Sequence, residues 1–255
     1  MKVLVKSVEV VCQEGITIVY LNEPDSLNAL SKTLKEELGK VLAQIENDDS
    51  IKVVIFTGRG RSFCAGGDVK AMKLSYDPIE VKKGMEASAN MIKKIRGLSK
   101  ITISAVNGYA AGAGMSLAIS SDIIIADENA KFVLSFKNVG LIPDLGLHYH
   151  LLRRVGEWKA KEWIWSGKRL TAQEAYEYGF VTEIVPDGLL LNRALEKAQE
   201  LIKGPIQSYI SSKLIINRFQ QASLDEVLEK EVDIQTIIKG TNEHKEAVNM
   251  FFSKR

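Results

Sequence analysis

Two glycine-rich turns, each placed directly after a short apolar run, most strongly limit how this chain can fold. They are Phe63-Cys64-Ala65-Gly66-Gly67-Asp68-Val69-Lys70 and Gly108-Tyr109-Ala110-Ala111-Gly112-Ala113-Gly114-Met115-Ser116. The apolar runs, residues 52–57 and 101–106, are typical of strands, and a stretch that can be helical follows each turn. Both turns can therefore point unpaired backbone N–H groups at one place, and two convergent N–H groups form an oxyanion hole.

Strand-like and helix-like patterns alternate through the first 185 residues. Residues 8–11 and 16–21 flank a turn and predict a hairpin. Helical spacing begins at Ser31, where Thr33 and Glu36 are expected to form a capping box. The sequence then predicts strands at 53–56, 101–106, 123–125 and 181–185, and helices at 78–96, after the second glycine turn, and at 145–154. This alternation predicts an α/β sheet with helical crossovers.

Beyond residue 185 only helical spacing remains. The expected helices span residues 189–202, 206–219, 224–238 and 244–252, with Pro205 and Gly240 as breaks. We therefore divide the chain into a core over residues 1–200 and a C-terminal helical region over residues 201–255. Helices that are apolar on more than one face pack on their own sheet or on a neighbouring subunit, so an oligomer is expected.

The composition excludes several classes of partner. Lys and Arg number 34 against 32 Asp and Glu, without a basic stripe, so neither nucleic acid nor an anionic membrane surface is an expected partner. The two cysteines, Cys12 and Cys64, suit free thiols in a reducing compartment, and a cytoplasmic location is expected. No segment approaches the roughly 18 apolar residues that a membrane-spanning helix requires.

Simpler explanations exist for each feature taken alone. Glycines can merely let a helix pack close to a strand. Gly112 and Gly114 could begin a dinucleotide-binding fingerprint, but Leu117 stands where the third glycine is needed. His148 and His150 lie two residues apart on an expected helix and lack the spacing of a metal-binding pair, so no metal is expected.

Several motifs occur together in a fixed order, and together they are far more specific than any one of them. They are Leu21-Asn22-Glu23-Pro24, Leu27-Asn28-Ala29-Leu30, the two glycine turns, Ser121-Asp122, Ala130-Lys131-Phe132, Leu170-Thr171-Ala172-Gln173-Glu174-Ala175 and Gly179-Phe180-Val181. From about residue 8 to residue 200 the chain resembles the enoyl-CoA hydratase/isomerase, or crotonase, superfamily. The resemblance implies an α/β fold of repeated ββα units wound into a spiral. It also implies a C-terminal helical region that mediates trimerisation, giving a homotrimer or hexamer.

The resemblance further implies roles for both turns. The backbone N–H groups of Gly67 and Ala113 would bind the thioester oxygen of an acyl-CoA substrate, and these two residues with Ala65 and the Asp68-Val69-Lys70 segment would line the coenzyme A path. No separate cofactor is expected, because coenzyme A is part of the substrate. Preorganised N–H groups stabilise an enolate oxygen more than a ground-state carbonyl, which agrees with the reading of the turns above.

The chain departs from the hydratase pattern at two positions. Hydratases of this superfamily hold and activate water with two glutamates. Aligned by motif, those positions carry Ser116 and Phe136 here, and neither side chain is a general base. Because addition of water needs paired acid and base groups, efficient hydration is not expected.

One carboxylate remains in the expected neighbourhood. Asp144 lies in the loop Gly140-Leu141-Ile142-Pro143-Asp144-Leu145-Gly146, which resembles the loop of isomerase members in which an aspartate shuttles a proton. Asp144 could instead cap the following helix. Three functions stay open: a 3-enoyl-CoA to 2-enoyl-CoA isomerase that uses Asp144; another crotonase-type enzyme, such as a weak or atypical hydratase; and a non-catalytic acyl-CoA-binding or RNA-binding member.

Overall fold

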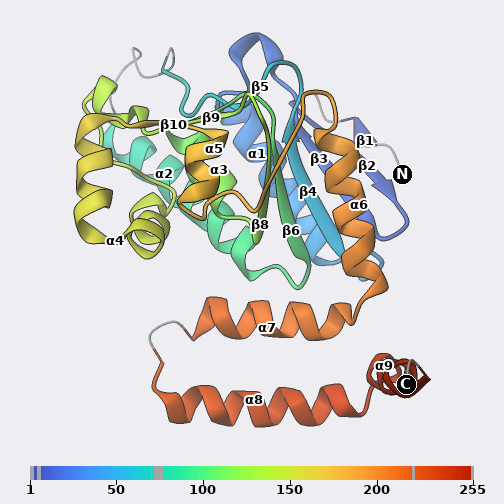
Figure 1. The fold of residues 1–255 in the computed structure, drawn as a ribbon. Helices are drawn as coiled ribbons and strands as arrows, with labels where there is room; N and C mark the ends of the chain where they lie inside the picture. Colours follow the sequence, from blue (N-terminus) through green and yellow to red (C-terminus); the bar gives the residue numbers. More distant parts are fainter. Residues whose placement is uncertain (1–2, 5–6, 70, 72–76, 220–221, 254–255) are drawn as a thin grey trace.

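Two β-sheets with helices packed against them form the body of the protein (Figure 1). The structure is a computed structural model and describes residues 3–4, 7–69, 71, 77–219 and 222–253. The larger sheet has the order β1 (Val3–Leu4), β2 (Val8–Gln13), β3 (Ile16–Leu21), β4 (Val53–Gly58), β6 (Ile101–Val106), β8 (Ile123–Asp127), β11 (Glu183–Val185). The smaller has the order β10 (Arg169–Thr171), β9 (Lys131–Val133), β7 (Tyr109–Ala111), β5 (Ser62–Cys64).

From β4 to β9, consecutive strands alternate between the two sheets, and a helix follows each pair. Strands β4 and β5 precede α2 (Pro78–Gly97), β6 and β7 precede α3 (Ala113–Ile119), and β8 and β9 precede α4 (Leu147–Ser166). Strands β3, β4, β6, β8 and β11 pair in parallel. This arrangement confirms the predicted α/β fold of ββα units. Because β5 and β7 are also parallel neighbours, their carboxyl ends, where the two glycine turns begin, lie side by side.

The first helix begins two residues earlier than the predicted capping box implies. Helix α1 (Lys32–Glu46) is capped by Ser31, whose Oγ accepts a hydrogen bond from the Leu34 N–H at 3.0 Å. The predicted box of Thr33 and Glu36 is wrong, because Ser31 is the last extended residue and its hydroxyl already reaches the third helical N–H. The remaining helices are α5 (Ala172–Glu177), α6 (Leu190–Lys203), α7 (Ile206–Arg218), α8 (Leu224–Lys239), α9 (Asn242–Ser253) and the 3₁₀ turns η1 (Pro24–Ser26) and η3 (Ser135–Val139).

The larger sheet is buried on both faces. Val19 and Leu21 of β3 belong to one apolar cluster with Leu34 of α1, whereas Ile18 belongs to a second cluster with Ala194 of α6. Every residue of β3 is buried, as expected for a central strand covered by helices on both sides. The glycine turns and α3 lie on the α1 side.

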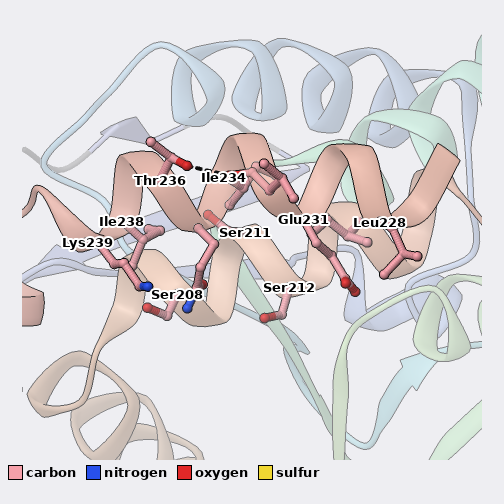
Figure 2. A pocket seen from close by; sticks show the side chains of 12 residues that line it. Ser208, Ser211, Ser212, Leu228, Glu231, Ile234, Thr236, Ile238 and Lys239 are labelled. Carbon is pink, nitrogen blue, oxygen red and sulfur yellow. Dashed lines mark hydrogen bonds between the residues drawn. The ribbon is translucent and has the colours of Figure 1, made fainter. Parts of the chain in front are cut away.

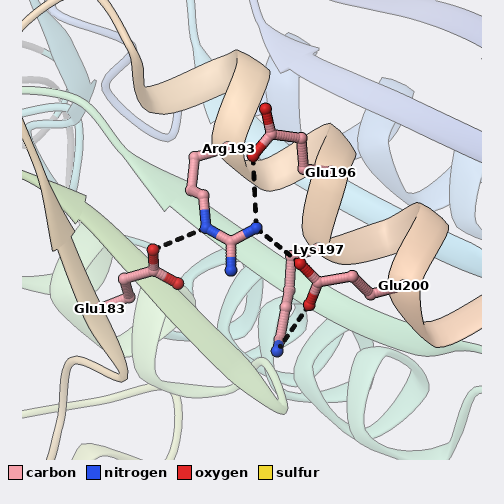
Figure 3. A network of polar contacts seen from close by, with 5 residues as sticks. All are labelled: Glu183, Arg193, Glu196, Lys197 and Glu200. Carbon is pink, nitrogen blue, oxygen red and sulfur yellow. Dashed lines mark hydrogen bonds and ion pairs between the residues drawn. The ribbon is translucent and has the colours of Figure 1, made fainter.

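From α6 to α8, the C-terminal helices lie progressively farther from the larger sheet (Figure 1). An ion-pair network holds α6 to the sheet: Arg193 contacts Glu183 of β11 at 2.6 Å and Glu200 of its own helix at 2.9 Å (Figure 3). Helices α8 and α9 have no buried residues, and α8 runs beside α7 (Figure 1). A cavity of about 560 Å³ lies between these two helices (Figure 2). No helix in the described part of the chain is long and apolar enough to cross a membrane.

Candidate active site

The two glycine turns touch each other. Gly66 has a φ of +102°, and a Cβ added there would lie 2.6 Å from the Ala111 carbonyl oxygen and 3.4 Å from the Ala113 nitrogen. A Cβ on Gly114 would lie 2.1 Å from the Cys64 carbonyl oxygen. Real side chains do not occupy such space, so only glycine allows the first turn to approach the start of α3 this closely.

Gly67 in the first turn and Ala113 in the second each have a backbone N–H without an acceptor among the described residues. Leu30 forms a parallel bridge with Gly67 and donates its own N–H to the Gly66 oxygen at 2.7 Å, so the Gly67 N–H faces away from Leu30. Ala113 is the first residue of α3, where an N–H has no intrahelical acceptor. Neither N–H donates a hydrogen bond to another residue of the described chain.

The rest of the first turn runs from the interior to the surface. The Ala65 N–H donates to the Leu27 oxygen at 2.9 Å, Asp68 is half-buried, and Val69 is exposed. Lys70, which was also expected along the coenzyme A path, lies outside the described residues. The described segment therefore connects the free N–H of Gly67 with the surface of the protein.

Two asparagines hold these turns, although the sequence analysis assigned no role to their side chains. Asn28 is fully buried and donates to the carbonyl oxygens of Arg59 at 2.9 Å and Ser62 at 2.7 Å. Asn107 donates to the Gly58 oxygen at 2.9 Å. Asn28 has a φ of +57°, a conformation that asparagine tolerates better than most residues. The available signals were Asn28 within the Leu27-Asn28-Ala29-Leu30 motif and Asn107 directly before the second glycine turn.

Ser116 and Phe136, the positions at which the resemblance implies the glutamates of hydratases, hold no carboxylate. Ser116 is fully buried on α3, and its hydroxyl donates to the Gly112 oxygen of the preceding turn at 3.4 Å. Phe136 is buried on η3, and its ring would lie 3.9 Å from a Cβ on Gly112. A hydroxyl that is already bonded and a phenyl ring thus stand beside the second glycine turn.

One oxygen of the Asp144 carboxylate, Oδ1, is buried and has no hydrogen-bond partner among the described residues. Burial raises the pKa of Asp144, while its own backbone N–H and the ammonium group of Lys35 act to lower that pKa. Lys35 lies one turn into α1, the helix that begins beside the Leu30–Gly67 bridge. The first glycine turn and the Asp144 loop therefore share α1 as a neighbour.

The capping explanation for Asp144 is wrong. Helix α4 begins at Leu147, not at residue 145, and its N-cap is Gly146, without a side-chain cap. Leu145 and Gly146 have φ values of +50° and +80°, and these two left-handed residues separate Asp144 from the helix. A leucine in this region is strained, and such strain is more frequent at functional sites.

The two histidines and Cys64 form no second candidate site among the described residues. His148 is exposed and His150 is buried, as their spacing predicts. Burial raises the pKa of the Cys64 thiol to about 12, so this thiol stays protonated and packs as a small apolar group. The described residues contain no group of three or more His, Cys, Asp or Glu that could hold a metal ion.

Comparison with known proteins identifies the family. A family model described as enoyl-CoA hydratase/isomerase matches residues 12–255. The chain belongs to this family. Its members act on acyl-CoA thioesters, which agrees with two glycine turns that each leave a backbone N–H free.

Relatives of the enoyl-CoA hydratase/isomerase family cover almost the whole chain. A putative enoyl-CoA hydratase/isomerase YhaR of Bacillus subtilis is 34% identical, over 97% of this chain and 96% of the relative. The 1,2-epoxyphenylacetyl-CoA isomerase of Escherichia coli is 35% identical, over 95% of this chain and 94% of the relative. The crystal structure of an enoyl-CoA hydratase from Bacillus anthracis matches with a TM-score of 0.91 and 31% identity, over 98% of this chain and 97% of the hydratase chain. A relative named as an isomerase and one named as a hydratase thus have a similar sequence identity to this chain.

Proposed function

We propose that this enzyme moves the double bond of a 3-enoyl-CoA to the 2-position, with Asp144 as the proton shuttle. The observation that carries this proposal is the buried, unpartnered Oδ1 of Asp144. The carboxylate-free positions Ser116 and Phe136 support it, because a double-bond shift needs one base whereas hydration needs a pair of groups on one water.

The reaction follows from these groups. The N–H groups of Gly67 and Ala113 donate to the thioester oxygen. The Asp144 carboxylate takes a proton from C2, the C2–H electron pair forms the C1–C2 double bond of a dienolate, and the negative charge gathers on the oxygen. The dienolate electrons then take the proton back from Asp144 at C4, which leaves the double bond between C2 and C3. Asp144 ends in the state in which it began.

Burial suits Asp144 to this task. A carboxyl group shuttles a proton best when its pKa is close to the working pH, and desolvation raises the pKa of Asp144 in that direction. The Escherichia coli relative is also named an isomerase of a CoA thioester, in its case of an epoxide.

The test compares two activities in the same protein. Isomerisation of a 3-enoyl-CoA is followed as the gain of conjugated thioester absorbance, and hydration of a 2-enoyl-CoA as its loss. Asp144→Asn is expected to lower isomerisation about 100-fold or more while acyl-CoA affinity is kept. Asp25→Asn, an exposed change of the same chemistry, is the matched control and should have no effect.

Two results would contradict the proposal. An Asp144→Asn variant with full isomerase turnover would remove Asp144 from the mechanism. Rapid hydration of crotonyl-CoA by the wild-type enzyme would show that two glutamates are not required here, and it would favour the hydratase alternative.

We also infer that the C-terminal helices assemble a homotrimer or hexamer. Helix α8 has no buried residue, and its apolar residues Leu224 and Val232 are 71% and 66% exposed. Phe252 of α9 is 65% exposed. Covering such side chains with a second copy stabilises both copies. Light scattering should give three or six times the mass of one chain, and a monomer at micromolar concentration would contradict this inference.

A further inference from the structure

A second cavity, of about 520 Å³, lies between α2, α4 and α7. Four cationic side chains line it, namely Arg96 of α2, Arg153 and Arg154 of α4, and Lys213 of α7. Asp122 supplies the one carboxylate among the lining residues of the described structure. The cavity therefore concentrates positive charge from three helices that are far apart in the sequence.

The single carboxylate neutralises only the lysine. Asp122 Oδ2 lies 2.8 Å from the Lys213 ammonium and accepts hydrogen bonds at 2.8 Å from both the N–H and the hydroxyl of Thr102. Lys213 also donates to the Lys100 carbonyl oxygen at 2.7 Å. Asp122 and Lys213 neutralise each other, so no carboxylate among the described lining residues is left to neutralise the arginines.

The three arginines have only neutral partners within the residues that the structure describes. Arg96 donates to the Asn217 amide oxygen at 2.8 Å, and Arg154 donates to the Gly179 carbonyl oxygen at 2.5 Å. Arg153 donates to the Tyr149 carbonyl oxygen at 3.2 Å and stacks 3.6 Å from the centre of that ring. A guanidinium has five N–H donors, so most donors of these groups remain available to a ligand.

The positive charges around the cavity help to lower the pKa of a buried histidine. His150 also lines the cavity, and its pKa is lowered to about 4, first by burial and then by Arg96, Arg154 and Arg153. At neutral pH the ring is therefore uncharged. A negative ligand would lower the energy of this whole group of charges, since Asp122, the one carboxylate among the described lining residues, is paired with Lys213.

The cavity is separate from the candidate active site. It is bounded by Ile119 at the carboxyl end of α3, whereas Ala113 stands at the amino end of the same helix. The six rises of about 1.5 Å from Ala113 to Ile119 place these two ends about 9 Å apart, with the fully buried α3 between them.

We propose that this cavity binds a small molecule through a phosphate monoester group. Planar guanidinium groups bind phosphate oxygens in pairs, and Arg96, Arg153 and Arg154 offer such pairs from two sides. Tyr149 and Tyr209 supply aromatic surface for the body of the ligand, and the volume lies in the range of small-molecule sites. The phosphate monoester can belong to a free phosphorylated compound or to the ribose 3′-phosphate of coenzyme A.

Calorimetry with phenyl phosphate tests the proposal, with phenol as the uncharged comparison. The wild-type enzyme should bind phenyl phosphate and not phenol. The double variant Arg153→Gln/Arg154→Gln should bind it about 10-fold more weakly or worse, because two charge-assisted contacts are lost. Lys159→Gln/Lys161→Gln removes the same charge from the same helix outside the cavity and should leave the affinity unchanged.

Competition separates the two sources of the phosphate. If coenzyme A displaces phenyl phosphate and 3′-dephospho-coenzyme A does not, the substrate's own phosphate occupies the cavity. If neither displaces it, the ligand is a separate phosphorylated compound. Equal affinity of the wild type and the arginine double variant would overturn the proposal. A wild type that binds no phenyl phosphate, together with a double variant that dissociates into smaller species, would also overturn it and assign the arginines to a subunit contact.

Discussion

Asp122 and Asp144 show how differently one fold can treat two carboxylates. The Asp122 side chain is 21% exposed, and its Oδ2 receives the Thr102 N–H, the Thr102 hydroxyl and the Lys213 ammonium, all at 2.8 Å. Asp144 is half-buried, and its Oδ1 receives no hydrogen bond from the described residues. Because buried polar atoms are almost always satisfied, the first carboxylate is explained by stability and the second calls for another explanation.

The backbone is held by a hydrogen bond at Asp122 and is strained beside Asp144. Asp122 lies in the turn between α3 and β8, and its N–H is held by the Thr102 carbonyl oxygen at 3.1 Å. Asp144 precedes Leu145, which has a φ of +50°. Strain and an unmet hydrogen bond both cost stability, and they occur together at Asp144. The comparison predicts that damage at the Asp122 pair changes stability, whereas damage at Asp144 changes chemistry.

The largest stability effect is expected at the lysine that pairs with Asp122. The Lys213 side chain is 5% exposed, and burial lowers its pKa, so its charge depends on the ion pair. Lys213→Met should cost about 3 kcal/mol in urea unfolding, because it removes one partner of a largely buried pair. Lys197→Met, in an exposed pair with Glu200, should cost less than about 1 kcal/mol. Equal costs for the two variants would break the comparison.

A smaller effect, visible only in acid, is expected at His150. Its folded-state pKa of about 4 lies below the ordinary value of 6.5, so the unfolded chain takes up a proton before the folded one does. Its contribution is therefore complete above pH 6.5 and is lost as the pH falls toward 4. Between pH 7 and pH 5 this loss is about 2 kcal/mol.

Unfolding of two matched variants isolates the histidine. His150→Gln should reduce the loss of stability between pH 7 and pH 5 by that amount, and the exposed His148→Gln should not change it. Identical pH profiles for wild type and His150→Gln would show that the pKa of His150 does not differ between the folded and unfolded states, which contradicts the lowered pKa.

Much of the fold is predictable because local patterns determine it. The apolar run at residues 101–106 became β6 with the same limits, and the helix expected at 78–96 ends one residue later. Long periodic segments specify their own structure, since burial of one face requires the period. Helix α4 was predicted much too short, because Gly156, with a φ of +76°, interrupts the pattern while the chain continues as a second helical segment.

The candidate site is less predictable, because side chains distant in sequence set its chemistry. Gly67, Ala113 and Asp144 were selected from motifs, and their roles stay predictions. Nothing in the local sequence indicates that Oδ1 of Asp144 lacks a hydrogen-bond partner, or that the charge of Lys35 on α1 lowers the pKa of this carboxyl group. The arginine cavity is equally hidden, because α2, α4 and α7 meet only in the folded chain.

The smallest expected effect separates the two roles once considered for Asp144. If Asp144 capped α4, Asp144→Ala would cost about 1 kcal/mol and Asp144→Asn almost nothing, since asparagine is also a good cap. With Gly146 as the cap, both variants should unfold within about 0.5 kcal/mol of each other. Burial raises the folded-state pKa of Asp144, so the charged form costs stability once the pH exceeds the ordinary pKa, and neither neutral variant should be less stable than the wild type at pH 7. Urea unfolding at pH 7 decides: a loss of about 1 kcal/mol in Asp144→Ala alone would restore the capping role and make Asp144 resemble Asp122.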